Sequence, residues 1–242
     1  MLVLLPPSES KHVRTRGRPM DLGSLSWPEL TTTRERLLDA LAEASSRPDA
    51  VELLKVSPGL GEEVARNTRL RTAPAVPVAE LYTGVLYDAL SLATLSSAGR
   101  RRATRTLVVA SALHGALRLG DRVSPYRLSM SARLPGLGPL AACWRPVLGP
   151  VLDAAAGDGL VVDCRSGSYA AAWTPARTER WVRVEVPGAT HLAKHTRGLV
   201  ARALCEHPGR PRGAEQLADA LAGEFTVALQ RTAKGWALQV GR

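Results

Sequence analysis

The sequence is poor in aromatic residues and in cysteine. Only 4% of its 242 residues are aromatic, so the hydrophobic core is predicted to consist mainly of Leu, Val and Ala. The three cysteines, Cys143, Cys164 and Cys205, are odd in number and far apart, and no CxxC pair occurs. This spacing indicates neither a disulfide framework nor a zinc site, and it favours a reducing compartment.

The sequence also lacks a long apolar run. No segment approaches the roughly 18 apolar residues that a membrane-spanning helix requires. The apolar start, residues 1–7, is too short for a secretory signal and has no preceding basic region, so we interpret it as a buried strand. We therefore expect a cytoplasmic protein with no membrane partner. The five histidines form no recognised metal signature, and we expect neither a metal nor a cofactor.

Lysine is rare, whereas arginine is abundant. The chain has four lysines, which leaves 28 arginines among its 32 basic residues, against 22 acidic residues. The formal net charge is +10 and the pI is about 10.3. Genomic base bias explains a preference for arginine over lysine, but not the excess of cations over acids. Such a basic protein favours polyanionic partners, because each neutralised phosphate releases condensed counterions.

Apolar periodicity predicts the fold class. Buried strands are predicted over four continuous apolar segments, 2–5, 106–112, 160–164 and 181–186. Helices are predicted at 34–44, 81–95, 140–155 and 191–206. This alternation indicates an α/β or α+β fold with a central mixed sheet flanked by helices. We expect one domain over residues 1–242, with a linker at 72–79 and a C-terminal β-hairpin at 225–240.

Residues 50–71 contain the pattern of a helix-hairpin-helix unit inserted in this domain. Ser57, Gly59 and Gly61 belong to a Ser-Pro-Gly-Leu-Gly segment, in which two glycines permit a tight turn. Backbone N–H groups at the start of the second helix would hold a DNA phosphate without reading its sequence. Nearby cations are Lys55, Arg66, Arg69 and Arg71. An ordinary turn without a ligand is the alternative, because the acidic pair 62–63 competes with phosphate.

Polar loops follow three of the predicted strands. Lys11 follows the first strand, Ser111 and His114 follow the second, and Ser166 follows the third. If these strands are parallel, their carboxyl ends meet at the edge where α/β proteins place ligands. Lys11 would then bind a phosphate as a point charge, and serine or backbone groups would orient it. Turn-forming or capping roles for the serines and glycines are the alternative.

The same four residues are the catalytic candidates. Lys11 would act as a phosphate clamp or base, and Ser111 or Ser166 would position the substrate or attack it. His114 would carry a proton. Polar residues concentrated in strand-end loops are what a catalytic pocket requires and what DNA binding alone does not.

A fixed backbone precedes another candidate cation. Pro125 defines the direction of the chain ahead of Tyr126 and Arg127. Arg127 offers a planar fork that suits phosphate or carboxylate. A structural ion pair between Arg127 and Asp121, beside a packed tyrosine, is the alternative.

The predicted helix at 191–206 carries a basic stripe. Lys194 and Arg197 share one face of this helix, which is either a DNA-facing surface or a solvated one. His191 and His195 have the i, i+4 spacing of metal ligands. Because no third ligand lies near them in the sequence, solvated or capping histidines are favoured.

Five sequence blocks carry a family resemblance. They are LLPPSESK at 4–11, LYTGVLYDAL at 81–90, SALHGALR at 111–118, PYRL at 125–128 and KHTRG at 194–198. The blocks occur in the order seen in the YaaA family of bacterial peroxide-stress proteins and extend over nearly the whole chain. The chain resembles the branch of that family with PPSE and RSGxY blocks.

The resemblance implies an α/β fold with a helix-hairpin-helix and a positively charged cleft. It also implies binding to duplex or branched DNA and a role in limiting iron-driven oxidative damage under peroxide. By matching position, the hairpin is 57–61 and the cleft is lined by Lys11, Tyr82, Arg127, Lys194 and Arg197. Two residues depart from the pattern. His114 replaces a frequent aromatic, and Ser168 stands where a sister branch has Glu, so that Glu's acid/base role is not carried over.

Two functions remain open at this point. The favoured one is a non-enzymatic, sequence-tolerant DNA binder. The alternative is an enzyme acting on a nucleotide, a nucleobase or a phosphorylated small molecule in the strand-end cleft. An iron-sequestering protein is disfavoured, because no carboxylate and histidine cluster is visible in the sequence.

Overall fold

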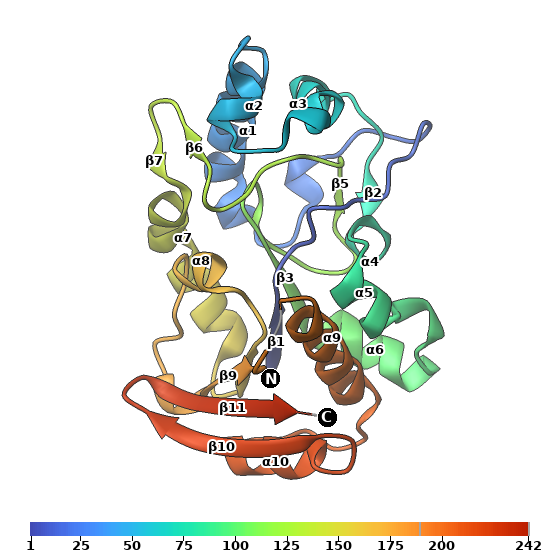
Figure 1. Cartoon of the computed structure of the whole chain (residues 1–242), viewed down its shortest axis with the longest axis vertical. Helices are drawn as coiled ribbons and strands as arrows, with labels where there is room; N and C mark the ends of the chain where they lie inside the picture. Colours follow the sequence, from blue (N-terminus) through green and yellow to red (C-terminus); the bar gives the residue numbers. More distant parts are fainter. Residues whose placement is uncertain (189, 242) are drawn as a thin grey trace.

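A seven-stranded mixed sheet forms the centre of the molecule (Figure 1). The computed structural model describes residues 1–188 and 190–241. The strand order is β10-β11-β9-β8-β1-β3-β4. Neighbours from β11 to β3 run parallel, and the edge strands β10 and β4 are antiparallel to theirs. The strands are β1 Leu2–Leu5, β3 Leu107–Ser111, β4 Gly115–Leu117, β8 Val161–Asp163, β9 Trp181–Glu185, β10 Thr226–Thr232 and β11 Gly235–Gly241.

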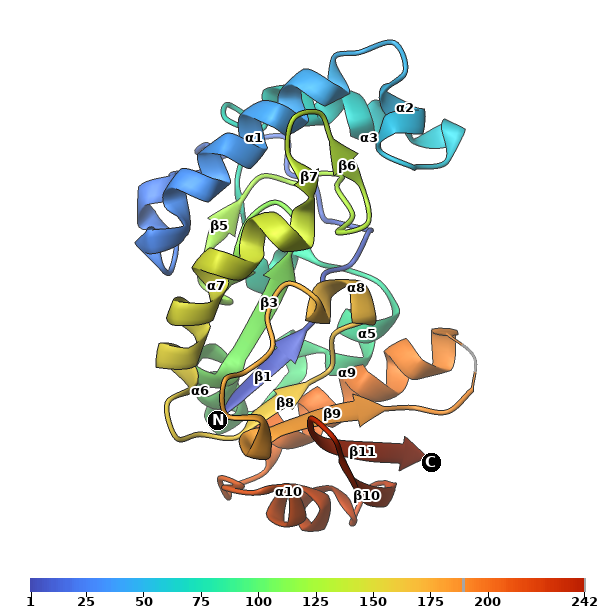
Figure 2. The ribbon, with the colours of Figure 1, turned by 90° about the vertical axis from the view of Figure 1, so that its left-hand side faces the viewer.

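Helices cover both faces of this sheet (Figure 2). In β1, Val3 and Leu5 pack into one core, while Leu2 and Leu4 pack into the other. The first core also contains apolar residues of α5 Val85–Leu90, α6 Ser97–Thr106, α9 Thr190–Glu206 and α10 Ala214–Leu221. The second contains those of α1 Thr31–Ser45 and α7 Leu140–Ala156. Burial on both faces explains why β1 is apolar at every position.

Short elements complete the fold. The short helices are η1 Leu22–Ser24, η2 Pro28–Leu30, α2 Ala50–Leu53, η3 Pro58–Leu60, α3 Gly61–Arg66, η4 Asn67–Arg69, α4 Val78–Leu81, η5 Leu92–Thr94, α8 Gly167–Ala170 and η6 Thr178–Arg180. Two small antiparallel ladders pair β2 Val76–Pro77 with β5 Arg122–Val123, and β6 Arg133–Leu134 with β7 Gly138–Pro139. No helix in the described residues is both long enough and apolar enough to span a bilayer.

The predicted fold class is confirmed, and so are the four buried strands and the C-terminal hairpin. Two local predictions are wrong. Residues 72–79 are not a linker, because Val76 and Val78 are buried and this segment forms β2 and the start of α4. The helix predicted at 81–95 is interrupted, because Gly84 has φ 94° and Ser91 has φ 45°, both outside the helical region.

The predicted helix-hairpin-helix is not confirmed. Residues 50–71 form the four-residue helix α2, the turn η3 and the six-residue helix α3, followed by η4. Lys55 follows α2 with φ 54°, so a left-handed residue redirects the chain before the turn. Gly59 and Gly61 do not have positive φ, and a Cβ added at either would meet no atom within 4 Å. The backbone at this turn therefore does not require glycine.

The close packing of α9 against α5 predicts a strong effect of one methyl group. A Cβ at position 198 would lie 2.2 Å from the carbonyl oxygen of Leu86 and 2.8 Å from Ala89 Cβ. We expect Gly198→Ala to lower the free energy of unfolding by roughly 1–3 kcal/mol, because the two helices must move apart. Urea denaturation measures this change. The matched control is Gly223→Ala, since nothing lies within 4 Å there, and equal stability of both variants would contradict this account of the packing.

Candidate functional site

A cleft of about 430 Å³ lies at the carboxyl ends of β1 and β8. Figure 2 shows the tip of β1 directed towards α8 and α5. The chain passes from β1 to β3 on one side and returns to β8 on the other, so the cleft lies where the strand order reverses. Its lining comprises Pro6, Pro7, Ser8, Glu9, Ser10, Gly84, Val85, Leu86, Tyr87, Ser129, Ser166, Ser168, Tyr169, His191, Lys194 and Arg197. We call this site the strand-end cleft.

Positive charge dominates the lining of the strand-end cleft. Lys194 and Arg197 lie on α9 and line the cleft opposite the serine-containing loops after β1 and β8. Arg197 Nε donates to the carbonyl oxygen of Val184 at 3.4 Å, which ties its guanidinium to β9. Glu9 is the one carboxylate among the described lining residues. The lining therefore combines hydroxyl groups with cations, a set of donors suited to an anionic ligand.

Arg127 neutralises that carboxylate. One of its terminal nitrogens lies 2.8 Å from Glu9 Oε2, and the other lies 3.5 Å from Glu63 Oε2 on α3. Asn67 fixes the backbone of Arg127 by accepting from its N–H at 2.8 Å and donating to its carbonyl at 2.9 Å. The proposed ion pair with Asp121 is wrong, because Asp121 instead accepts hydrogen bonds from the Ser26 and Arg118 backbones. Arg127 thus joins the loop after β1 to α3.

Lys11 lies behind the loop that forms one wall of the cleft. Its Nζ donates to the carbonyl oxygens of Ser8 at 2.8 Å and of Glu9 at 3.3 Å. The ammonium also lies 4.5 Å from the ring centroid of Tyr126 and 5.6 Å from that of Tyr82. Residues 11 and 82 form an isolated antiparallel bridge, which holds the two side chains together. The amine is therefore held by carbonyl groups and aromatic faces rather than by a carboxylate.

A buried chain of hydroxyl groups continues from these tyrosines. Ser111 Oγ lies 2.7 Å from Tyr126 OH, which lies 3.0 Å from Tyr82 OH. The backbone N–H of His114 donates to Ser111 Oγ at 2.9 Å, and the His114 ring meets the Tyr126 ring edge-on. Tyr82 stacks on Tyr87, a residue of the cleft lining, with centroids 5.4 Å apart. Sequence reasoning therefore placed these groups in the right region, but they lie behind the cleft wall.

Burial sets the protonation of this network. It lowers the pKa of Lys11 to about 7, assisted by the nearby charge of Arg127. It lowers the pKa of His114 to about 3, assisted by Arg34 and Lys11, so the imidazole is neutral at pH 7. Burial also raises the pKa of Tyr82 and Tyr126, whose hydroxyls stay protonated. Lys11 is thus the one member of this network poised to exchange a proton near neutral pH.

A buried ion pair holds the loop after β8. Arg165 donates to Asp163 at 2.7 Å and 2.9 Å, and both side chains are 2% exposed. Trp181 Nε1 donates to the same carboxylate at 3.0 Å, and Arg165 also donates to the carbonyl of Trp173 at 2.8 Å. Breaking such a pair by removing one partner strands a buried charge. The pair therefore fixes the path of the chain that brings Ser166 to the cleft.

The residues predicted around the short turn at 57–61 lie outside the strand-end cleft. Lys55, Ser57, Gly59 and Arg69 are exposed, while Gly61 and Arg66 are half-buried. The turn is thus accessible at the surface rather than packed in the core. Its connection to the cleft is indirect and passes through Glu63 and Arg127. In the described residues no group of three or more His, Cys, Asp or Glu side chains is placed to hold a metal ion.

Several site residues were not singled out from the sequence. Glu9 neutralises Arg127, Asn67 fixes its backbone, and Tyr87 and Tyr169 form part of the cleft lining. Tyr87 and Glu9 lie inside the conserved-looking sequence blocks at 81–90 and 4–11, which gave a signal for them. Nothing in the local sequence marks Asn67, because its role depends on contact with a residue 60 positions away.

Comparisons with known proteins support one family over the whole chain. A family profile described as peroxide stress protein YaaA matches residues 1–230. A UPF0246 protein of Streptomyces coelicolor is 48% identical over 254 residues, which cover 99% of this chain and 98% of the relative. UPF0246 proteins of Corynebacterium efficiens and Corynebacterium glutamicum are 41% and 35% identical, covering 92% and 90% of this chain and the same shares of their own lengths.

The buried amine of Lys11 predicts a pH-dependent stability. Its pKa of about 7 lies below the ordinary value of 10.5, so between these values the unfolded chain binds more protons than the folded chain. The free energy of unfolding should therefore rise with pH across this window, by at most about 1.4 kcal/mol per pH unit from this group. Urea denaturation of the wild type and of Lys11→Met measures the difference. Parallel pH profiles of the two proteins would contradict the low pKa.

Proposed function

Since the chain belongs to the peroxide stress protein YaaA family, we propose that it binds DNA phosphates in the strand-end cleft without reading base sequence. Through this binding it would limit iron-driven oxidative damage in the cytoplasm under peroxide. The observation that carries the proposal is the charge of the cleft. Lys194 and Arg197 line it, and its carboxylate, Glu9, is paired with Arg127. A phosphate entering the cleft meets cations and hydroxyls rather than uncompensated carboxylates.

The serine-containing loops supply the remaining contacts in this proposal. Ser8 precedes the lysine-bearing loop, while Ser166 and Ser168 flank the start of α8. Their hydroxyls would donate to phosphate oxygens and set the register of the backbone in the cleft. The exposed turn at 57–61, with Lys55 beside it, is proposed as a second and weaker phosphate contact on the same DNA.

Lys11 would tune this interaction with pH. Below its pKa of about 7 the amine is charged, and above it the amine is neutral. The added charge lies behind the carbonyls of Ser8 and Glu9, close to the wall of the cleft. Affinity for an anion should therefore be higher below pH 7 than above it.

Replacing the two cleft cations tests the proposal. We expect Lys194→Glu with Arg197→Glu to weaken duplex and four-way-junction binding by on the order of 10- to 100-fold, because each lost phosphate contact removes counterion release. The slope of log affinity against log salt should also fall by about 2. Fluorescence anisotropy at two salt concentrations measures both quantities.

The matched control is Arg36→Glu with Arg101→Glu. Both arginines are exposed, lie outside the strand-end cleft and produce the same change of net charge. This control should lose far less affinity than the cleft variant. Equal losses would show that net charge alone drives binding, and an absence of wild-type binding at low salt would reject the proposal.

The buried network favours a second candidate function. An enzyme acting on a nucleotide, a nucleobase or a phosphorylated small molecule would use Lys11, whose pKa of about 7 suits proton transfer. Ser166 lines the cleft and is placed to contact such a substrate. Ser111 and His114 are fully buried, so in this function they would position Tyr126 and Lys11 rather than touch the substrate.

A turnover assay separates the two functions. With a panel of nucleotides, nucleobases and sugar phosphates, an enzyme should show activity that Lys11→Met lowers by on the order of 100-fold or more, the usual contribution of a general base. Ser166→Ala should then change the Michaelis constant or the turnover number. If the panel gives no turnover and Lys11→Met alters only DNA binding, the enzymatic function is rejected.

A further inference from the structure

A second basic hollow lies at the opposite edge of the sheet, where the parallel strands begin. Two cavities of about 260 Å³ and 350 Å³ adjoin here, because Met1 and Arg210 line both. Thr106 and Leu160, which directly precede β3 and β8, also belong to their linings. The arginines of the two linings are Arg102, Arg105, Arg180, Arg210 and Arg212. We call these two cavities together the amino-edge groove.

The charge of this groove is largely uncompensated. Arg105, Arg210 and Arg212 are exposed, and within residues 1–188 and 190–241 none of them has a carboxylate within ion-pair distance. The carboxylate in the described lining is Asp158, which already pairs with Arg177. Three free guanidinium groups therefore face a hollow without a protein anion to balance them.

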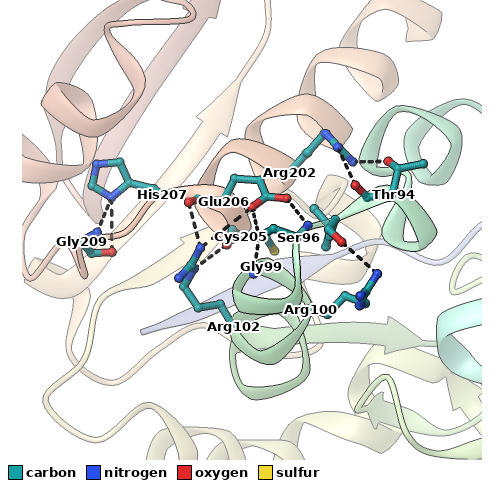
Figure 3. A network of polar contacts seen from close by, with 11 residues as sticks. Thr94, Ser96, Gly99, Arg100, Arg102, Arg202, Cys205, Glu206, His207 and Gly209 are labelled. Atoms are coloured by element: carbon teal, nitrogen blue, oxygen red, sulfur yellow. Dashed lines mark hydrogen bonds and ion pairs between the residues drawn. The ribbon is translucent and has the colours of Figure 1, made fainter.

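A fixed polar network supports one side of the groove (Figure 3). The carboxylate of Glu206 accepts from the Ser96 backbone N–H at 2.7 Å and from its hydroxyl at 2.6 Å. Arg102 donates to the carbonyls of Cys205 at 2.5 Å and of Glu206 at 2.8 Å. A Cβ at Gly99 would lie 2.7 Å from the Glu206 carboxylate, so this junction admits no larger residue.

This network has two consequences for the groove. The charge of Glu206 serves the start of α6, where Ser96 is the capping residue, and is not free to neutralise the exposed arginines. The end of α9 and the start of the following loop are held to α6, so the side of the groove near Arg105 and Arg210 is built before a ligand arrives. Preorganised cations bind an anion with a smaller entropic cost than mobile ones.

The composition of the lining indicates the chemistry of the ligand. Arginine forks match the geometry of phosphate oxygens. No aromatic side chain is among the described residues that line either cavity, so there is no surface on which a base would stack. The cations extend over two adjoining cavities rather than converging on one point. This arrangement suits a chain of phosphates that is bound without contact to its bases.

We propose that the amino-edge groove binds the phosphodiester backbone of a second nucleic-acid segment. The strand-end cleft lies at the other end of strands that are four or five residues long, which separates the two surfaces by roughly 15 Å. One protein molecule would then hold two DNA segments at once. The bridging, though not the groove's own affinity, rests on the function proposed for the strand-end cleft.

A tethering assay tests this proposal directly. One duplex is fixed to beads, the protein is added, and retention of a second, fluorescent duplex is measured. We expect the wild type to retain it and Arg105→Glu with Arg210→Glu to lose on the order of 90% of the retention, because phosphate contacts are replaced by repulsion. Arg36→Glu with Arg101→Glu is the matched control, since Arg101 lies on the same helix as Arg105 but outside the groove.

The binding of a single duplex separates this inference from the function proposed above. If the groove variant still binds the fixed duplex but no longer tethers the second, both proposals are supported. If Lys194→Glu with Arg197→Glu leaves all binding intact while the groove variant abolishes it, the strand-end cleft fails and the groove stands. If the groove variant tethers as well as the control does, the inference is overturned.

Two further arms close the remaining routes. Retention that appears only where sedimentation shows protein dimers would overturn the inference, because two copies would then supply the two sites. Tight binding of ATP that depends on Arg105 and Arg210, without any loss of tethering in their variant, would also overturn it. The milder Arg105→Gln with Arg210→Gln, checked by circular dichroism, gives the same comparison if the charge-reversal protein does not fold.

Discussion

The parallel pairing of β1 with both β3 and β8 is the constraint on which the rest of the structure depends. It buries both faces of β1 and forces apolar residues at every position of the strand. It also places the polar segments that follow β1 and β8 side by side, at the point where the strand order reverses. The same pairing collects the starts of the strands at the other edge, where the amino-edge groove lies.

The excess of positive charge is used in different ways at these places. Arg34 and Arg165 are buried and hold the frame through backbone carbonyls and a buried carboxylate. Arg127 neutralises Glu9, so that Lys194 and Arg197 decide the sign of the strand-end cleft. The arginines of the amino-edge groove remain unpaired in the described part of the chain. Net charge therefore understates the local potential that a polyanion meets.

The sequence predicted the frame of the molecule better than the details of its site. Buried strands were recognisable because a strand covered on both faces is continuously apolar, and parallel strand ends correctly placed Ser166 beside Lys194. Side-chain partners were not predictable in this way. Arg127 chose Glu9, 118 residues away, instead of the nearby Asp121. The fully buried position of His114 and the meeting of α6 with the loop after α9 also depend on the assembled fold.

Hydrogen exchange of the protein with and without duplex DNA tests the central claim most directly. The account predicts that DNA slows amide exchange in the loop after β1, at residues 6–10, in the segment 166–169 and in the first turns of α9. These segments line the strand-end cleft and would be shielded by a bound backbone. DNA binding that leaves exchange in all three segments unchanged would contradict the account.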